Sequence, residues 1–532
     1  MTANKKPSRS IAGIAGIVAI ATLVSKIFGL VREQIIAAAF GIGNVNIAYT
    51  YAYNLPSFLL VLIGGINGPL HTALVSVLAK KNKSEAAPIV ESVTTLVSIL
   101  LLLLTVALIC FAGTFIDIQG PELTPEVREI AILQLKIMAP LALLAGLIGI
   151  GFGTLNASDS YLLPSISPLF SSVAVVLSMT VLIWRTEGQL NTPQYMQLGA
   201  VVLAGSTLAG AILQWLAQLI VQWRLGMGKL KLGFNWRIPG VVDVFRVMAP
   251  AILSSGMLQV NVSTDLFFAS KIAGAAPAMR SANLIAITPL GIISNMILVP
   301  FLPVFSRLAA PENWQDLKVR IRQGIFLSAL TMLPLTAIFI SLSLPIIRLV
   351  YEYGEFDSNA TQFVAPLLAT YGLGLFFYLA RDVLVRVFYA LGDGQTPFKI
   401  SVINIILNAV FDYLLVNTYG APGLVLATIS VNIISMVTFV WILHRRLNGL
   451  PLLEWSRGIF GLIMASAIAG MASWIISQAF EQFLGSGNLL LLVLELGVSS
   501  LIAMIVFTLI AMQLKLPELK MLASRIRQKL GR

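Results

Sequence analysis

The sequence contains little charge and almost no cysteine or histidine. Only 11% of its 532 residues are Asp, Glu, Lys or Arg, whereas about a quarter of the residues are charged in an average soluble protein. Together with a mean hydropathy of +0.90, this composition excludes a soluble enzyme. The single cysteine, Cys110, has no partner for an intrachain disulfide, and the two histidines, His71 and His444, are far apart in the sequence. We therefore expect neither a zinc site nor thiol chemistry.

Long apolar segments, in contrast, recur along the whole chain. Each is about 20 residues or longer and can cross a bilayer as a helix. The fourteen segments are 10–39, 46–79, 88–117, 127–155, 162–184, 197–223, 240–270, 278–306, 323–350, 361–391, 397–416, 422–443, 458–480 and 488–514. They predict an all-α polytopic membrane protein with 14 transmembrane helices. The second segment contains Gly64 and Pro69 and the eighth contains Pro289 and Pro300, so we expect both helices to be kinked or broken.

The positive charges predict the orientation in the membrane. The net charge of +12 could suggest nucleic-acid binding, but the 35 Lys and Arg are scattered among hydrophobic segments and form no basic face. Most of them fall in the termini and in every second connection. The opposite side holds only Arg128, Arg185, Lys271 and Arg348. By the positive-inside rule, we expect both termini to face the cytoplasm.

A few cations remain inside the predicted spans, where each costs about 2.5–3.5 kcal/mol unless it faces water or a partner. They are Lys26, Arg32, Lys136, Arg246, Arg280, Arg381 and Arg386. In the first segment, Lys26, Arg32 and Glu33 lie within two helical turns. Arginine offers a fork of donors and lysine a point charge, so this cluster suits an anionic headgroup such as a diphosphate. The alternatives are a local Arg–Glu pair or snorkelling to the membrane surface, and snorkelling is also the alternative for Arg280.

A second polar pattern follows three later segments at i,i+4 spacing, which places each set on one helix face. The sets are Asn261 with Asp265, Asn404 with Asn408 and Asp412, and Thr428 with Asn432. Carboxylate, amide and hydroxyl oxygens without His or Cys suit Na⁺ or a proton rather than a transition metal. The alternative interpretation is hydrogen bonding between helices.

Three further observations concern single groups. Asp382 and Arg386 are also spaced i,i+4 and are expected to neutralise each other within one helix. Lys136 and Glu495 have no partner visible in the sequence. No catalytic triad, paired catalytic carboxylates or P-loop is evident, so transport is favoured over enzymatic activity.

A short internal repeat divides the chain. Residues 139–146 (APLALLAG) return as residues 365–372 (APLLATYG), six predicted helices later. An offset of six helices conserves orientation, so two six-helix lobes in parallel pseudo-repeat are expected. The predicted division is 1–225 for the N-lobe, 226–447 for the C-lobe, and 448–532 for helices 13 and 14 with a basic cytoplasmic tail. The alternative is chance similarity of segments rich in Ala, Leu and Gly.

Three motifs resemble those of the MurJ (MviN) lipid II flippases, within the MOP exporter superfamily. They are Ser25–Gln34 (SKIFGLVREQ), Tyr353–Phe356 (YGEF), and Arg386–Asp393 (RVFYALGD) followed by Thr396-Pro397. The resemblance implies two lobes around a cationic cavity, with helices 13 and 14 forming a groove for a polyprenyl tail. It also implies the substrate, lipid II, an undecaprenyl-diphosphate-linked peptidoglycan precursor that is moved to the outer leaflet of the bacterial plasma membrane.

The resemblance also implies functional residues. Lys26 and Arg32 match the family's essential cations in helix 1, and Glu33 matches the acid that follows them. Positions that bind Na⁺ in family members correspond to Asp265, Asn408, Asp412, the carbonyl of Leu424, and Thr428. Na⁺ is therefore expected as a coupling or structural ion, and no other cofactor is expected.

The chain departs from the family pattern in two helices. Leu284 stands where a cavity arginine is expected, and Arg280, one turn earlier on the same face, is a candidate to compensate for it. In helix 2, family charges are replaced by Ile47, Leu60 and Asn67. We therefore expect a cavity that is less charged than the family pattern.

These observations lead to the hypothesis of a lipid II flippase that works by alternating access, in which Lys26, Arg32 and Arg280 hold the diphosphate. Na⁺ or the membrane potential is expected to bias its states, and other cell-wall synthesis proteins are candidate partners. Alternatives are a flippase for another polyprenyl-linked oligosaccharide, a MATE-like multidrug exporter, or a membrane scaffold for wall-synthesis enzymes that transports nothing.

Overall fold

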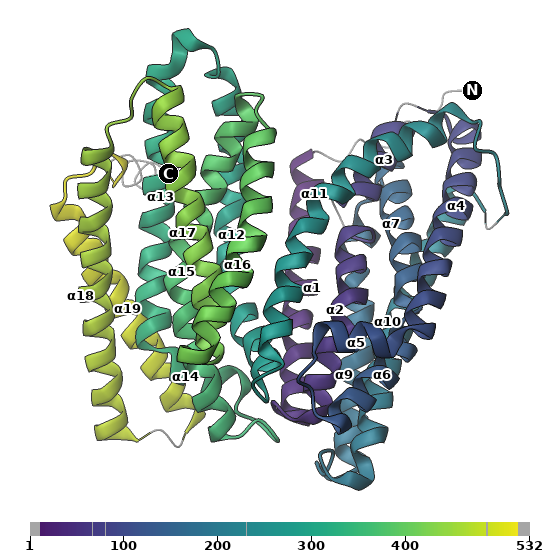
Figure 1. Cartoon of the computed structure of the whole chain (residues 1–532), viewed down its shortest axis with the longest axis horizontal. Coiled ribbons are helices and arrows are strands. Elements are labelled where there is room, and N and C mark those ends of the chain that lie inside the picture. Colours follow the sequence, from purple (N-terminus) through teal and green to yellow (C-terminus); the bar gives the residue numbers. More distant parts are fainter. Residues whose placement is uncertain (1–10, 66–67, 80, 230, 486–487, 520–532) are drawn as a thin grey trace. The chain divides into compact units, whose positions relative to one another are not determined.

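The computed structural model of the chain is built of helices (Figure 1). It describes residues 11–519 apart from 66–67, 80, 230 and 486–487. Over these residues it contains 19 α-helices and one short 3₁₀ helix, with no β-strand. Backbone groups in a bilayer must find their hydrogen bonds within the protein, and a helix provides them within one segment. The all-α prediction is confirmed.

The helices divide between two compact units. The first unit contains residues 1–277 together with the short segment Tyr353–Phe356, and the second contains the remainder. The helices that begin in the first unit are α1 (Ile11–Phe40), α2 (Asn44–Leu62), α3 (Pro69–Leu78), α4 (Lys83–Cys110), α5 (Ala112–Gln119), α6 (Pro125–Met138), α7 (Leu141–Ala157), α8 (Leu162–Ile166), α9 (Pro168–Arg185), α10 (Pro193–Leu225) and α11 (Pro239–Ala269).

The second unit begins near the start of α12. Its helices are α12 (Ala275–Arg307), α13 (Trp314–Ser341), α14 (Ser343–Tyr351), α15 (Ser358–Ala390), α16 (Gln395–Tyr419), α17 (Ala421–Arg446), α18 (Leu452–Leu484) and α19 (Leu489–Gln513). Within it, α13 packs against α15 and α18, α17 packs against α15 and α16, and α18 and α19 form an antiparallel hairpin.

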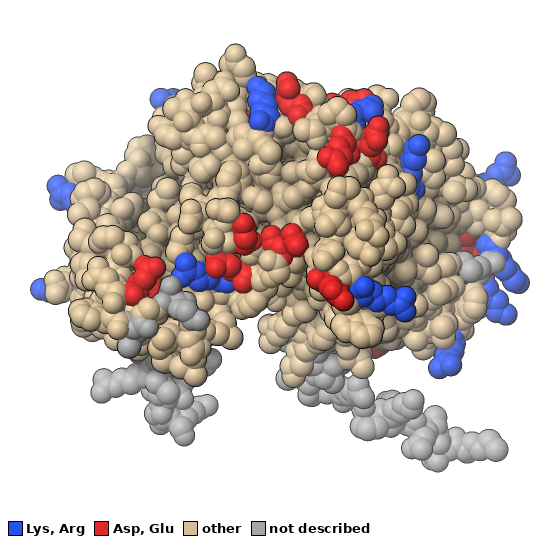
Figure 2. Space-filling view, turned by 90° about the horizontal axis from the view of Figure 1, so that it is seen from below, with Lys and Arg blue, Asp and Glu red and all other residues tan. Residues whose placement is uncertain are grey.

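Each predicted apolar segment corresponds to one helix or to two consecutive helices. Among the described residues, eleven helical stretches are long and apolar enough to cross a membrane. The exact count of fourteen is not confirmed, because α1, the pair α2 and α3, and α11 are not among the eleven. Most of the surface that Figure 2 shows carries neither acidic nor basic side chains, as a chain of this composition requires.

The predicted break in the second apolar segment is present. Helix α2 ends at Leu62 and α3 begins at Pro69, where proline fits the first helical position because its missing N–H is not needed there. A Cβ on Gly64 would lie 2.7 Å from the carbonyl oxygen of Ala145, and one on Gly149 would lie 2.2 Å from that of Ile63. The glycines therefore let the break approach the backbone of α7.

The eighth apolar segment is not broken. Helix α12 continues from Ala275 to Arg307 with Pro289, Pro300 and Pro303 inside it. The two copies of the internal repeat also differ, because Pro140 separates α6 from α7 whereas Pro366 lies inside the continuous helix α15. A proline removes one backbone hydrogen bond of a helix, but its presence in the sequence does not determine whether the helix ends there.

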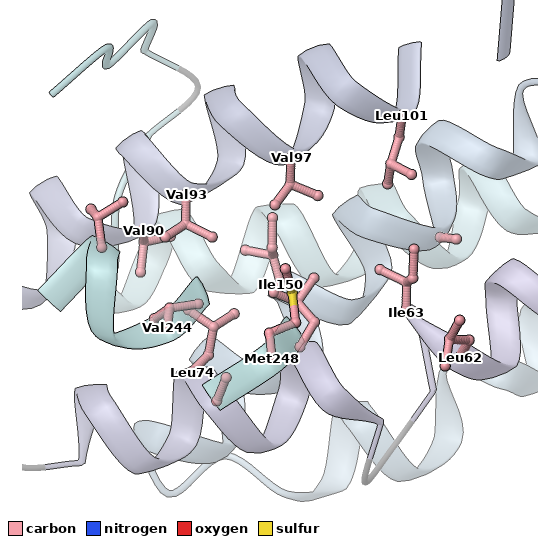
Figure 3. Close-up of a cluster of buried hydrophobic side chains, with 14 of the residues drawn as sticks. Leu62, Ile63, Leu74, Val90, Val93, Val97, Leu101, Ile150, Val244 and Met248 are labelled. Carbon is pink, nitrogen blue, oxygen red and sulfur yellow. The ribbon is translucent and has the colours of Figure 1, made fainter. Parts of the chain in front are cut away.

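Helix α11 packs in the first unit. Val244 and Met248 of α11 join a buried cluster with side chains of α3, α4 and α7, among them Leu74, Val93 and Ile150 (Figure 3). In a membrane such clusters are held together by close packing, because lipid tails are as apolar as the side chains and moving a side chain out of lipid gains little free energy. The boundary between the two compact units therefore lies after residue 277, whereas the predicted lobe boundary follows residue 225.

Hydrogen bonds fasten the later part of α11 to the same unit. The Asn54 side chain of α2 donates to Gln119 Oε1 of α5 over 2.7 Å and accepts from Gln259 Nε2 of α11 over 2.6 Å. The hydroxyl of Tyr51 donates to the carbonyl of Leu266 over 2.8 Å. These bonds join α2, α5 and α11, and they position the part of α11 that carries Asp265.

The segment Tyr353–Phe356 belongs to the first unit although it connects α14 to α15. The backbone N–H of Glu355 donates to the carbonyl of Ala38, at 2.9 Å, and the Glu355 carboxylate accepts from Asn191 Nδ2, at 2.8 Å. Gly354 has a φ of +60°, and a Cβ there would lie 2.4 Å from the Ala38 carbonyl oxygen. Glycine is therefore required both by the backbone conformation and by the close approach.

The connection between α15 and α16 is tied to the end of α17. Asp393 accepts hydrogen bonds from the backbone N–H and the hydroxyl of Thr396, over 3.0 and 2.8 Å. It also pairs with Arg446, at 2.7 Å. Partial burial alone would raise the pKa of Asp393, but the bonds from Thr396 and Arg446 outweigh burial and hold that pKa below its ordinary value of 3.8.

We expect Gly354→Ala to destabilise the protein more than Gly392→Ala. Both glycines have positive φ, +60° and +73°, which costs an ordinary residue about 1–2 kcal/mol. Only Gly354 also faces a backbone atom, because nothing lies within 4 Å of a Cβ built on Gly392. The apparent melting temperature of the purified variants measures the difference, and equal losses would contradict the close approach at Ala38.

We expect the stabilisation from Asp393 to depend on pH. Because its pKa is lowered on folding, its contribution is complete above the ordinary value and is lost as the pH falls through the lowered one. Asp393→Asn should therefore lower the apparent melting temperature at neutral pH, by an amount that corresponds to about 1 kcal/mol, and the deficit should shrink in acid. Arg446→Gln, which removes the same ion pair, is the matched control. A deficit that is independent of pH for both variants would contradict the ion pair's role.

Candidate functional site

The predicted cations of helix 1 lie on α1, which packs against α8 and α9. Lys26 is exposed, and its neighbour Ser25 donates from its hydroxyl to the carbonyl of Ser165, at 3.1 Å. The Nε and Nη2 atoms of Arg32 both donate to Oε1 of Glu33, at 3.1 and 2.7 Å. The side chains of Arg32 and Glu33 remain 19% and 12% exposed. The local Arg–Glu pair therefore exists and fixes the guanidinium while leaving part of it accessible.

Two tyrosines that the sequence analysis did not single out accompany this pair. The phenol groups of Tyr49 and Tyr53, on α2, interact electrostatically with Arg32. Their rings stack with centroids 5.2 Å apart and planes 11° apart, and the Tyr49 hydroxyl shares a hydrogen bond with Thr207 over 3.1 Å. Their i,i+4 spacing, which places both on one face of α2, is the signal that could have identified them.

Arg280 lies in the second unit, on α12, whereas Lys26 and Arg32 lie in the first. It is half-buried, and so is Leu284 one turn later. Near them, the Tyr351 hydroxyl of α14 donates to the carbonyl of Ser281, at 3.4 Å.

The three positions of predicted helix 2 at which family charges are replaced differ in their surroundings. Ile47 is buried in the first unit, where a charge could not be hydrated, and Leu60 is half-buried. Asn67 lies outside the residues that the structure describes.

Four of the five predicted Na⁺ ligands meet between α16 and α17. Asn408 donates to Asp412 over 2.8 Å, and the Thr428 hydroxyl lies 3.3 Å from Asn408 Oδ1 and 3.4 Å from the carbonyl oxygen of Leu424. Asp412 is fully buried and Asn408 is 1% exposed. The fifth residue, Asp265, is half-buried on α11 and belongs to the first unit.

This oxygen-rich group continues to an arginine. Asn432 donates to the carbonyl of Thr428 over 2.7 Å and accepts from Nη1 of Arg381 over 3.0 Å. The carboxylate of Asp382 interacts electrostatically with both Arg381 and Arg386, although no salt bridge joins Asp382 to Arg386 among the described residues. Arg381 also reaches across to α17, where it donates to the amide oxygen of Asn432 at i,i+51, a contact that no helix periodicity indicates.

An apolar pocket of about 500 Å³ opens in the second unit between α13, α15 and α18. Aromatic and aliphatic side chains line it, including Phe376, Phe377, Met471 and Trp474, with Thr336 among its few polar groups. Such a lining suits an apolar ligand. The pocket involves the predicted helix 13 but has no lining residue on α19.

The fold is that of the MOP superfamily transporters. It is similar over 97% of this chain and 99% of the other to a solved structure of the lipid II flippase MurJ in an inward closed conformation, with a TM-score of 0.74 and 22% identity. It is also similar to an inward-facing MATE-family multidrug resistance transporter, with a TM-score of 0.63 and 17% identity over 81% of this chain and 98% of the other. The predicted fold class is confirmed.

Sequence comparison is more specific. The family described as "Lipid II flippase MurJ" matches residues 36–495. The chain is 58% identical over the full length of both proteins to the probable lipid II flippase MurJ of Synechocystis sp.. It is 27% identical to the lipid II flippase MurJ of Burkholderia cenocepacia, over 85% of this chain and 88% of that one. The chain therefore belongs to the lipid II flippase MurJ family, and the resemblance found in its motifs is confirmed.

Proposed function

We propose that this chain moves lipid II from the inner to the outer leaflet of the bacterial plasma membrane. The observation that carries the proposal is the pair of cations, Lys26 and Arg32, on an otherwise apolar helix of a member of this family. The relative from Synechocystis, named a probable lipid II flippase, supports the same substrate because the identity extends over the whole chain. The chain acts as a transporter and not as an enzyme.

The α1 geometry suits the capture of a diphosphate. Lys26 offers an exposed point charge, and Arg32 offers guanidinium donors that Glu33 holds in one orientation. A diphosphate that approaches Arg32 competes with Glu33 for the same donors, so binding is reversible rather than permanent. Reversible binding is what a carrier needs, because the headgroup has to leave on the other side.

We infer that both termini are cytoplasmic. The connections assigned to the cytoplasm hold most of the cations, among them Arg320 and Arg322 at the start of α13. The opposite side holds Arg128, which is neutralised by a two-pronged pair with Asp117 at 2.6 and 2.8 Å. An outer face with few and compensated cations fits the inferred orientation.

We also propose that the group at α16 and α17 holds Na⁺. The donors are a carboxylate from Asp412, an amide from Asn408, a carbonyl from Leu424 and a hydroxyl from Thr428, and such hard oxygen donors fit Na⁺. Asp265 of α11 is the remaining expected ligand. Bound Na⁺ would supply a positive charge to a buried carboxylate, and a gradient of it would bias the transport cycle.

The fold is shared with drug exporters, and the loss of Lys26 and Arg32 distinguishes the alternatives. A multidrug exporter of the MATE type should tolerate their loss, whereas a diphosphate carrier should not. A scaffold for wall-synthesis enzymes should support wall growth even when Lys26, Arg32 and Asp412 are all neutralised. Another polyprenyl-linked oligosaccharide would require the cations but would leave lipid II exposure unrestored.

We expect Lys26→Ala and Arg32→Ala to abolish complementation of bacteria depleted of their own flippase, as measured by exposure of lipid II at the outer leaflet. Loss of one charge-assisted contact should weaken diphosphate binding by about 10- to 100-fold. Lys136→Ala, at an exposed cation on α6, is the matched control and should complement. The wild type must restore lipid II exposure, and full activity of both α1 variants at normal protein levels would refute the role of these cations.

We expect Na⁺ to raise the apparent melting temperature of the purified protein relative to choline, because a ligand that binds the folded state stabilises it. Asp412→Asn and Asp265→Asn should each remove this increment. Asn404→Ala, which alters a neighbouring pair with Ser435, should retain it. A wild type that is insensitive to Na⁺ would end the sodium proposal and leave the flippase proposal standing.

A further inference from the structure

A buried carboxyl group lies in the hairpin formed by α18 and α19, away from the groups described above. Glu495 is the seventh residue of α19 and is 7% exposed. Its Oε1 atom accepts a hydrogen bond of 2.5 Å from the hydroxyl of Ser477 on α18. An ionisable side chain inside an apolar membrane helix is costly, and it commonly marks an ion or proton site.

The line along which α18 and α19 touch is called the seam here. Two serine hydroxyls lie in this seam, one helical turn further from the hairpin connection than Ser477 and Glu495. Because α18 and α19 run antiparallel and Ser477 meets Glu495, Ser473 and Ser499 come opposite each other one turn further from the hairpin connection. Both side chains are fully buried, and neither hydroxyl has a hydrogen-bond partner in the part of the chain that the structure describes.

These two hydroxyls are unusual for this protein. Many serine and threonine hydroxyls inside its other helices donate to the carbonyl one turn back, as Ser328 does to Gly324 and Thr105 does to Leu101, both at 2.8 Å. Buried polar groups that forgo this bond require another partner. The seam therefore contains oxygen atoms that are positioned for a ligand beside Glu495.

No cation of the protein neutralises Glu495 within the described residues. Helices α13 and α14 pack against the hairpin. The cations of α13 lie near its start, at Lys318, Arg320 and Arg322, and Arg348 of α14 pairs with Glu352 at 3.5 Å. On the hairpin itself, Glu481 is exposed one turn above Ser477, and Glu454 and Arg457 lie at the far end of α18.

We propose that Glu495, Ser473, Ser477 and Ser499 form a binding site for a small monovalent cation, either a proton or Na⁺. Either cation neutralises the carboxylate, and oxygen donors alone suit both. One turn deeper, the next residues of the seam are Ala469 and Ala503, which are fully buried and bring no further polar group to the site. The site is separate from the group at α16 and α17, and it does not depend on which substrate the protein carries.

Carbodiimide labelling tests the site, because dicyclohexylcarbodiimide reacts with protonated carboxyl groups in apolar surroundings. The full-length protein, purified in detergent, is labelled over a pH series in Na⁺ or in choline, and modification of Glu495 is read by peptide mass spectrometry. Labelling that falls as the pH rises and is suppressed by Na⁺ identifies a sodium site. Labelling that falls with rising pH equally in both salts identifies a proton site.

Variants test the serine ligands. Ser473→Ala combined with Ser499→Ala should weaken Na⁺ protection about tenfold, or shift the pH midpoint of labelling by a comparable factor in proton concentration. Ser500→Ala, at the half-buried neighbour that lies off the seam, should behave as the wild type, and Glu495→Gln should lose the label.

Three results would overturn the proposal. They are a wild-type Glu495 that is never labelled, labelling that is indifferent to both pH and Na⁺, and a double serine variant that matches Ser500→Ala. The labelling of the wild-type protein decides the first two even if a variant fails to fold. Because the readout is a covalent mark at Glu495, its failure is distinct from any failure of lipid II transport.

Discussion

The hydrocarbon core of a bilayer offers no hydrogen-bond partner to the backbone, and the rest of this structure follows from that constraint. Each segment that enters the membrane has to satisfy its own N–H and C=O groups, so helices are the solution throughout the described chain. The same absence of water makes every polar side chain expensive. The sites described above are accordingly places where helices bring two or more such side chains together and thereby reduce the cost of each.

Charged side chains are accommodated in different ways at the three places described above. On α1 a neighbouring carboxylate holds Arg32, so the pair is neutral until an anion competes for the arginine. Between α15 and α17, Arg381 is instead held by the neutral amide of Asn432, so its positive charge remains. In the α18 and α19 hairpin the roles reverse, and a carboxyl group is surrounded by hydroxyls. The protein therefore accommodates ionisable side chains in water-poor surroundings in three ways. These are a salt bridge, an arginine that donates to an amide, and a carboxyl group beside hydroxyls.

The sequence was sufficient for features that depend on local chemistry. Apolar length predicted the helices, Gly64 and Pro69 predicted the break between α2 and α3, and i,i+4 spacing predicted that Asn408 and Asp412 share one helix face. Contacts between distant segments were not predictable in the same way. The bond between Arg381 and Asn432 joins α15 to α17 across 51 positions, and α11 packs beside α3 in the first compact unit. The prolines of α12 show a further limit, since helical neighbours can absorb a lost backbone bond without a break.

The close seam of the α18 and α19 hairpin has a consequence for long flexible molecules. With Ala469 and Ala503 facing each other and fully buried, the two helices leave no channel of hydrocarbon width between them. The apolar pocket beside α18, which α13 and α15 also line, lies outside this seam. A long apolar chain in this region therefore finds its space beside the hairpin and not between its two helices.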